Sequence, residues 1–293
     1  MIFTDHKHRR YFNFYALFVC SLLAFVGLFW LVYILWDILV QGIAHLNLNL
    51  FVNDPAPPGM EGGGLRNAIV GHLLITTGAT ILGVPIGVLG GMFLAEYGRF
   101  TRFGRFMSAC ADVLLSAPTI VIGIAVYIVL VKPFSQFNGW SASVALGIIL
   151  IPVVLRTTEE MMSMVPWRLR EAALALGAPY HHVIKKISLS GAKTGIIAGV
   201  MFSIARIIGE TAPLLFTAFN SSVFTTDMSG AMPTITVNIF KYSLGPSDER
   251  HAIAWAASFV LVLLILVLTI SSRVLLHYGM KKRGFEKRNY LKD

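Results

Sequence analysis

The sequence predicts an all-α integral membrane protein with six transmembrane helices. Of its 293 residues, 56% are hydrophobic and 13% are charged, whereas soluble domains carry about 25% charged residues. A membrane-spanning helix needs ~20 mainly apolar residues. Six stretches approach or exceed that length, at about 14–39, 68–95, 113–131, 140–155, 194–219 and 252–272. This composition excludes an ordinary soluble protein.

Basic residues are distributed unequally between the two sides of these six spans. Most of the 24 Lys and Arg residues lie in the N-terminus, the loop at 99–105, the loop at 156–193 and the tail from residue 273. The opposite side carries only Arg66, Lys132, Lys241 and Arg250. Because cytosolic loops are enriched in Lys and Arg, both termini are predicted to be cytosolic. The net charge of +9 therefore indicates orientation and contact with the lipid bilayer, and no nucleic acid partner is expected.

The first apolar stretch is predicted to remain as an uncleaved anchor. Its apolar run is longer than that of a signal peptide, and no A-x-A cleavage site follows it. Cys20 and Cys110 lie within or beside predicted spans, so no disulfide is expected. Residues 1–67 are thus expected to comprise a cytosolic N-terminus, an anchoring helix and an outer loop.

Small residues and proline mark the next two spans. Glycines recur in the second span at positions 71, 78, 83, 87, 90 and 91. Because small residues let membrane helices approach closely, this span is expected to pack against neighbouring helices rather than lipid. Pro118, at the end of the run LSAP, predicts a kink near the start of the third span.

The loop between the fourth and fifth spans is predicted to contain two short helices. Pro166 suits a first helical turn, strong helix formers occupy 168–176, and Gly177 stands where a glycine ends a helix. Pro179 opens a second helix in the same way. A plain surface helix linking two spans is one interpretation of this pattern. The other is a helix that docks into a groove on another protein.

The side chains of the first helix favour docking. Ala172 and Ala173 leave the backbone open to close approach, and Leu174 and Leu176 offer apolar contact. Arg170 and Glu171 are expected to place charges beside them.

Spacing within this loop matches a known pattern. Glu171-Ala172-Ala173 is followed after three residues by Gly177, and after nine more by Ile187 and Leu189. The run at 159–190 resembles the EAA loop of permease subunits in ABC importers, with Ser190 in place of the final proline of that pattern. The resemblance implies a type I ABC importer permease fold with a cytosolic coupling helix. It also implies that the residues touching the ATPase are Glu171, Ala172, Ala173, Leu176 and Gly177.

Two charged residues lie deep in the fifth predicted span. Arg206 and Glu210 are each expected to cost about 2.5–3.5 kcal/mol there on insertion scales. Their i, i+4 spacing predicts one helix face, so one interpretation is a buried, self-neutralising ion pair. The other is that they line a solute path, where the guanidinium presents a bidentate fork to an oxyanion. Pro213 would break the helix one turn later.

Longer runs narrow the resemblance to one branch of these permeases. They are GGGL at 62–65, LAEYGR at 94–99, LLSAPTIVIG at 114–123, RTTEEM at 156–161, VPWRLREAALALGAP at 165–179 and ARIIGETAPLLFTA at 205–218. From about residue 42 to 273 the chain resembles the PstA family, the permease subunits of bacterial high-affinity phosphate importers. The resemblance implies passage of inorganic phosphate along Arg206 and Glu210. It also implies a permease domain at 68–276, followed by a basic cytosolic tail at 277–293.

The same resemblance implies the partners of the chain. They are a PstC-like second permease, a dimer of a PstB-like ATPase and an extracytoplasmic PstS-like phosphate-binding protein, with a PhoU-like regulator as a further candidate. Location in the bacterial cytoplasmic (inner) membrane follows from the same family.

No catalysis is expected in this chain. Lys193-Thr194 ends like a phosphate-binding loop, but that motif needs glycine where Ile187 and Ala192 stand. ATP and Mg²⁺ are therefore expected in the partner ATPase. His181 and His182 are adjacent, about 100° apart on a helix, so no metal site is predicted.

Two alternatives stay open. A permease for sulfate or molybdate would keep the EAA loop, and an ion-coupled secondary transporter would use Glu210 as a proton carrier.

Overall fold

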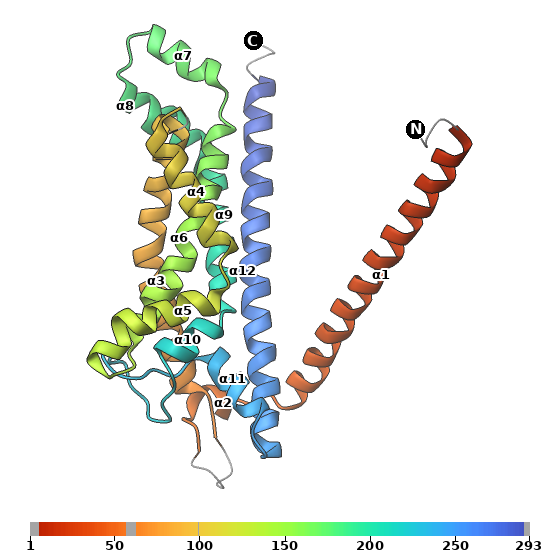
Figure 1. Cartoon of the computed structure of the whole chain (residues 1–293), viewed down its shortest axis with the longest axis vertical. Helices are drawn as coiled ribbons and strands as arrows, with labels where there is room; N and C mark the ends of the chain where they lie inside the picture. The colour runs from red at the N-terminus through yellow and green to blue at the C-terminus, as the bar shows by residue number, and fades with distance from the viewer. Residues whose placement is uncertain (1–5, 57–62, 99, 290–293) are drawn as a thin grey trace.

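The computed structural model describes residues 6–56, 63–98 and 100–289, and these residues form helices and loops without a strand. Long helices run along the long axis of the main bundle, and another long helix leans away from it (Figure 1). The helices of the bundle are α3 (Arg66–Phe93), α6 (Gly139–Ser163), α9 (Ser190–Ile208) and α12 (Asp248–Asn289), and the leaning helix is α1 (His6–Ala44).

Shorter helices connect these five. They are α2 (Asn49–Val52), α4 (Arg102–Ser116), α5 (Thr119–Val126), α7 (Trp167–Ala175), α8 (Tyr180–His182), α10 (Ala212–Thr217) and α11 (Ile235–Ser243). Wider π-helical segments extend three of the helices, at Leu94–Gly98, Tyr127–Val131 and Val183–Leu189, and a 3₁₀ turn covers Lys132–Phe134.

Five continuous helices in the described residues are long and apolar enough to cross a membrane. They are Arg9–Ala44, Arg66–Gly98, Gly139–Ser163, Tyr180–Ile208 and Asp248–Tyr278. A sixth crossing exists if Arg102–Ser116 and Thr119–Phe134, which meet at an angle of 102°, are one bent span. The predicted number of spans is thus reached only by counting the bent pair.

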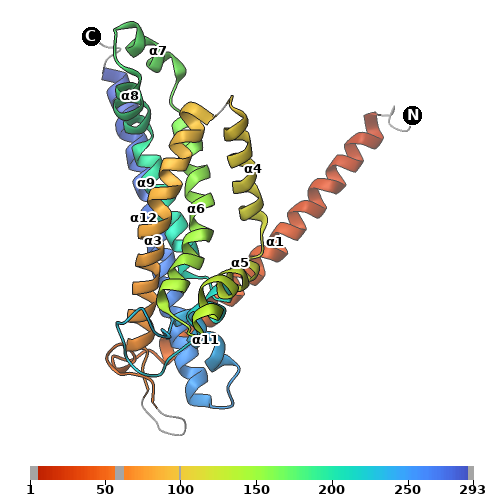
Figure 2. The same ribbon diagram turned by 60° about the vertical axis from the view of Figure 1, so that its left-hand side comes forward.

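The third span, predicted over 113–131, is interrupted near its start. Ala117 and Pro118 are extended, with ψ of 132° and 130°, and they separate α4 from α5. Proline disfavours a helical conformation in the residue before it and cannot donate a backbone hydrogen bond. The kink predicted at Pro118 is confirmed, and it is sharp enough to turn the chain across the bundle (Figure 2).

Helices α3 and α6 pack against each other along most of their length. A methyl group added to Gly87 would lie 2.7 Å from Cβ of Val154, and one added to Gly91 would lie 2.4 Å from the carbonyl oxygen of Leu155. Gly78 faces Ser143 in the same way. Small residues therefore allow the two backbones to approach closely, which confirms that the second span packs on protein.

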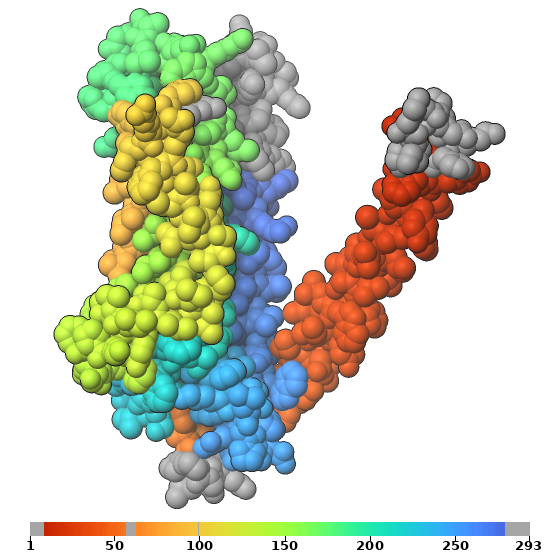
Figure 3. Space-filling model, in the orientation of Figure 1, coloured from red at the N-terminus to blue at the C-terminus, as the bar shows by residue number. Residues whose placement is uncertain are grey.

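Helix α1 contacts the bundle only near its C-terminal end. Gly42 packs against Phe259 of α12, whereas the rest of the helix stands apart in the space-filling view (Figure 3). Its exposed side chains include Trp30, Tyr33 and Trp36. A surface of this kind is stable against lipid tails or another membrane helix, since water would not solvate it.

Different segments of the chain lie at the two ends of the molecule. The start of α1, the end of α12 and α7 all point toward one end, and α2 and α11 lie at the other (Figure 1). The segments rich in Lys and Arg therefore share one end, as the charge distribution predicts. Which end faces the cytosol remains a prediction.

Candidate functional site

The fifth span breaks beside the two charged residues. Arg206 occupies the last turn of α9, which ends at Ile208. Glu210 lies outside any helix, and α10 begins at Ala212 with Pro213 in its first turn. The break predicted at Pro213 therefore comes earlier, at residues 209–211, and the predicted shared helix face of Arg206 and Glu210 is wrong.

Backbone contacts fix this break. The Gly209 N–H donates to the Arg206 carbonyl at 3.2 Å, and the Glu210 N–H donates to the Ile207 carbonyl at 3.1 Å. The Glu210 carbonyl accepts a 3.0 Å hydrogen bond from the hydroxyl of Thr236 in α11. Glu210 is thus held through its main chain, which leaves its carboxylate available to another group.

Neither charged side chain finds a partner in this subunit. Arg206 is exposed and Glu210 is half-buried, and neither side chain makes a hydrogen bond or ion pair within the described part of the chain. The self-neutralising pair is therefore not formed. Because an uncompensated guanidinium is unfavourable at membrane depth, Arg206 requires water, an anion or another subunit beside it.

The short helix α10 is wedged against α5. A methyl group on Gly123 would lie 2.6 Å from Cα of Pro213, so the two helices touch at backbone distance. The bent third span therefore supports the break in the fifth span directly. This contact places α5 and α10 at the same level as Arg206.

The helix predicted at 168–176 is confirmed as α7. Pro166 precedes its first residue, and Gly177 follows it with φ of 81°, in the left-handed region. The Gly177 N–H donates to the Leu174 carbonyl at 2.9 Å, and the Ala178 N–H donates to the Ala173 carbonyl at 3.1 Å. These two bonds form a Schellman motif, which glycine closes without steric cost.

The residues predicted to meet an ATPase lie at the surface of α7 and its end. Glu171, Ala172 and Gly177 are exposed, and Ala173 is half-buried. Leu176 is 89% exposed. These residues are therefore accessible at the surface, and their contact with an ATPase stays a prediction.

Arg170 does not belong to this exposed surface, contrary to the prediction. Its side chain is buried, and the residue is 4% exposed. Its Nε donates to Ser188 Oγ at 2.9 Å, and its Nη2 donates to the carbonyl of Met162 at 2.8 Å. The same nitrogen forms a 3.2 Å ion pair with Glu96 Oε1, whose side chain is fully buried.

We call Arg170, Glu96, Ser188 and Met162 the Arg170 joint. It ties α7 to the ends of α3 and α6 and to the segment that leads into α9. The hydroxyl of Tyr180 adds a 3.3 Å hydrogen bond to Glu96 Oε2. Sequence reasoning missed this joint because Glu96 and Arg170 lie far apart in the chain and only the fold brings them together.

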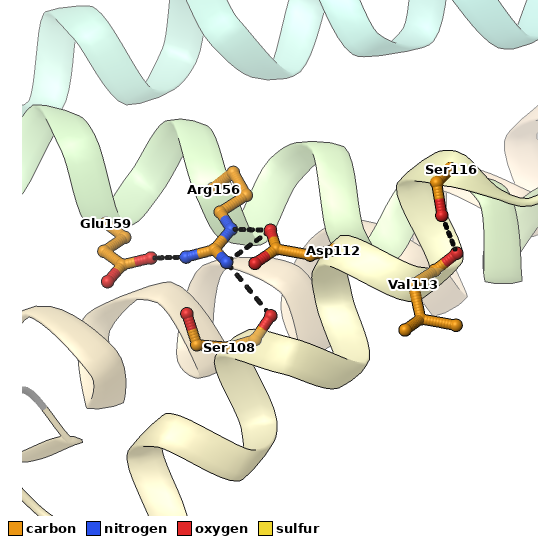
Figure 4. A network of polar contacts seen from close by, with 6 residues as sticks. All are labelled: Ser108, Asp112, Val113, Ser116, Arg156 and Glu159. Atoms are coloured by element: carbon orange, nitrogen blue, oxygen red, sulfur yellow. Dashed lines mark hydrogen bonds and ion pairs between the residues drawn. The ribbon is translucent and has the colours of Figure 1, made fainter.

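A second basic cluster joins α4 to α6. Arg156 of α6 bonds Asp112 and the Ser108 carbonyl of α4, and its Nη1 contacts Glu159 at 2.8 Å (Figure 4). The guanidinium is thus shared between two carboxylates from different helices. Arg156 therefore holds the two helices together and is not free to bind a solute.

The helix arrangement, with the glycine-closed helix α7, is the fold of the permease subunits of type I ABC importers. An inward-facing structure of the MetNI methionine ABC transporter aligns with a TM-score of 0.56 at 18% identity, over 73% of this chain and 94% of that chain. A crystal structure of an amino acid ABC transporter aligns with a TM-score of 0.50 at 17% identity, over 74% and 92% of the two chains. At such identities the likeness establishes the fold alone.

Sequence comparison identifies the family to which the chain belongs. The family model described as binding-protein-dependent transport system inner membrane component matches residues 87–277. The phosphate transport system permease protein PstA of Pasteurella multocida (strain Pm70) is 44% identical, over 92% of this chain and 97% of its own. PstA of Yersinia pestis is 42% identical, over 91% and 90%. The chain belongs to this inner membrane component family, in the branch of its PstA permeases.

Proposed function

We propose that this chain is the permease subunit of an ATP-driven importer of inorganic phosphate. The carrying observation is Arg206, which stands unpaired at the break of the fifth span in a chain that is 44% identical to a phosphate permease. A guanidinium there offers a planar fork to an oxyanion where water is scarce. The half-buried carboxylate of Glu210 adds an acceptor for the P–OH group of phosphate.

Several partner proteins are expected to assemble with this chain. A PstC-like permease completes the path, a dimer of PstB-like ATPases binds ATP and Mg²⁺, and a PstS-like protein delivers phosphate from outside. A PhoU-like regulator is a further candidate. The unpaired faces of α1 and of Arg206 support a second membrane subunit, because both are left uncovered in one chain.

Orientation follows from charge. We place both termini and α7 in the cytosol, because the segments at that end carry most of the Lys and Arg residues. In this orientation α7 meets the ATPase and α11 faces the outside. The division of the chain at residues 67 and 276 stays a prediction.

The function is tested in cells that lack their own PstA-type subunit. A tagged copy of this chain should restore uptake of radiolabelled phosphate, and a second permease and an ATPase should co-purify with it. Uptake of labelled sulfate and molybdate is measured in the same cells. Restored sulfate or molybdate uptake without phosphate uptake would reject phosphate as the substrate. Uptake that persists after the ATPase is removed would identify a secondary transporter.

Gly177 gives a sharp test of coupling through α7. Gly177→Val should reduce phosphate uptake about 5- to 30-fold, because a left-handed conformation costs a β-branched residue roughly 1–2 kcal/mol. An added Cβ meets nothing within 4 Å, so the cost is confined to the backbone. Gly177→Asn is the matched control, since asparagine tolerates positive φ. Recovery of the ATPase with the tagged chain is measured beside uptake.

Equal uptake in the valine and asparagine variants would show that the Schellman end of α7 does not couple the two proteins.

A further inference from the structure

A polar pocket of about 420 Å³ opens at the outer end of the bundle, beside α11 and the start of α12. Its lining includes Asn220, Ser222, Asn238, Lys241 and Arg250. It therefore presents two cations and two amides, and none of the described residues that line it is acidic. A pocket of this composition favours a small anion.

Both cations are held in position by aromatic rings. The Lys241 ammonium lies 4.1 Å from the centroid of the Phe219 ring, and the Arg250 guanidinium lies 5.7 Å from that of Tyr242. Neither makes an ion pair with a carboxylate among residues 6–56, 63–98 and 100–289. Burial lowers the pKa of Lys241 from its ordinary value. A nearby anion would offset that loss of solvation.

Buried amide groups point to a missing ligand. Asn238 is 1% exposed, and neither its Nδ2 nor its Oδ1 has a hydrogen-bond partner within the described chain. The Oδ1 of Asn220 is likewise buried and unbonded there. Because buried polar groups are nearly always hydrogen-bonded, the Asn238 Nδ2 lacks an acceptor and the two Oδ1 atoms lack a donor. An oxyanion supplies the acceptor, and the P–OH group of phosphate supplies a donor.

Arg66, at the same end of the bundle, differs from Lys241 and Arg250 because it is paired with a carboxylate. Its Nε donates to Asp54 Oδ1 at 3.1 Å, and its Nη2 donates to Asp54 Oδ2. The guanidinium also stacks over Phe224 at 4.5 Å. Arg66 is thus neutralised within the chain, whereas Lys241 and Arg250 are not paired in this way.

Helix α11 connects this pocket to the break in the fifth span. Thr236, near its start, holds the Glu210 carbonyl, and Asn238 and Lys241 follow on the same helix. We propose that the pocket is a second oxyanion site, which holds inorganic phosphate on the outer side before it reaches Arg206. This proposal rests on the proposed function, and it adds a phosphate-binding step on the outer side, before transport through the membrane.

The test uses the intact complex in lipid vesicles, with Ser222→Cys as a reporter in a chain whose Cys20 and Cys110 are replaced by Ala. An uncharged, impermeant thiol reagent is applied from outside. Phosphate in about tenfold excess over its Kd should slow labelling roughly tenfold relative to chloride at equal ionic strength, since the unoccupied fraction is 1/(1 + [L]/Kd). Lys241→Gln or Arg250→Gln should abolish this protection, and Lys241→Arg should retain it. Arg66→Gln is the matched control and should leave it intact.

Other results would overturn the proposal. They are absence of protection by phosphate, protection that survives both glutamine variants, protection by the binding protein alone, or protection that requires anionic lipid and is unaffected by phosphate. Uptake is measured in the same vesicles. Import without protection rejects only the pocket, and protection without import supports the anion site while rejecting the proposed function.

Discussion

Replacing Arg206 by Gln is expected to abolish phosphate uptake while the complex still assembles. The side chain is exposed and makes no bond within the described subunit, so its removal leaves no buried partner unpaired. Losing a charge-assisted contact to a desolvated anion costs about 2–5 kcal/mol, which corresponds to at least ~30-fold in rate. Arg206→Lys should also fail, because an ammonium keeps the charge and loses the planar fork.

The measurement is uptake of radiolabelled phosphate, with co-purification of partners to verify assembly. Lys132→Gln is the control, since Lys132 is an exposed basic residue that lies apart from the fifth span, in the turn Lys132–Phe134. If Arg206→Gln imports phosphate at the rate of Lys132→Gln, Arg206 does not belong to the path.

Glu210 should contribute to the choice of anion in the same assay. Phosphate near neutral pH bears a P–OH donor and sulfate does not, so a carboxylate accepts from the first and repels the second. Glu210→Gln is therefore expected to slow phosphate uptake and to make sulfate a stronger competitor. Because Glu210 does not bond Arg206 in this chain, the effect would not arise from releasing that arginine. A fully active and equally selective variant would remove Glu210 from the site.

The second large effect is expected at the Arg170 joint. Arg170→Met leaves the buried carboxylate of Glu96 uncompensated, which typically costs 3–5 kcal/mol. Helix α7 should lose its attachment, so the thermal stability of the solubilised complex and recovery of the ATPase should both fall. Arg168→Met is the matched control, because Arg168 is exposed on the same helix.

The double variant Arg170→Met with Glu96→Leu separates the ion pair from packing. Replacing both members of a buried pair by apolar residues is often close to neutral, so stability should partly recover. If Arg170→Met and Arg168→Met behave alike, the joint does not stabilise α7.

Helix ends and kinks that depend only on residues close in sequence could be predicted from the sequence. Gly177 ends α7 and Pro118 kinks the third span because each acts on its own backbone. The end of α9 was placed too late, although Gly209 followed by Pro213 matches a helix stop. The sequence therefore contained a signal for the break that separates Glu210 from the helix of Arg206.

The burial of Arg170 could not be predicted in this way. An arginine beside the EAA motif has the same local sequence whether its side chain faces a partner or the bundle. Its direction is set by Glu96 and Ser188, which come from other segments. The unpaired state of Arg206 is equally a property of the assembled helices and not of its neighbours in the chain.

Helix α3, with its π-helical extension, runs from one end of the bundle to the other. At its outer end the Asn67 amide donates to the carbonyl of Ser221, a residue of the outer pocket, and the π-helical segment that extends its other end carries Glu96 of the Arg170 joint. Linkage then imposes reciprocity: if engagement of the ATPase at α7 changes anion affinity at the outer pocket, an anion there changes ATPase affinity by the same factor. Such couplings are typically about 5- to 150-fold. Arrival of phosphate outside would thereby be sensed at the nucleotide-binding partner before the ion has moved through the membrane.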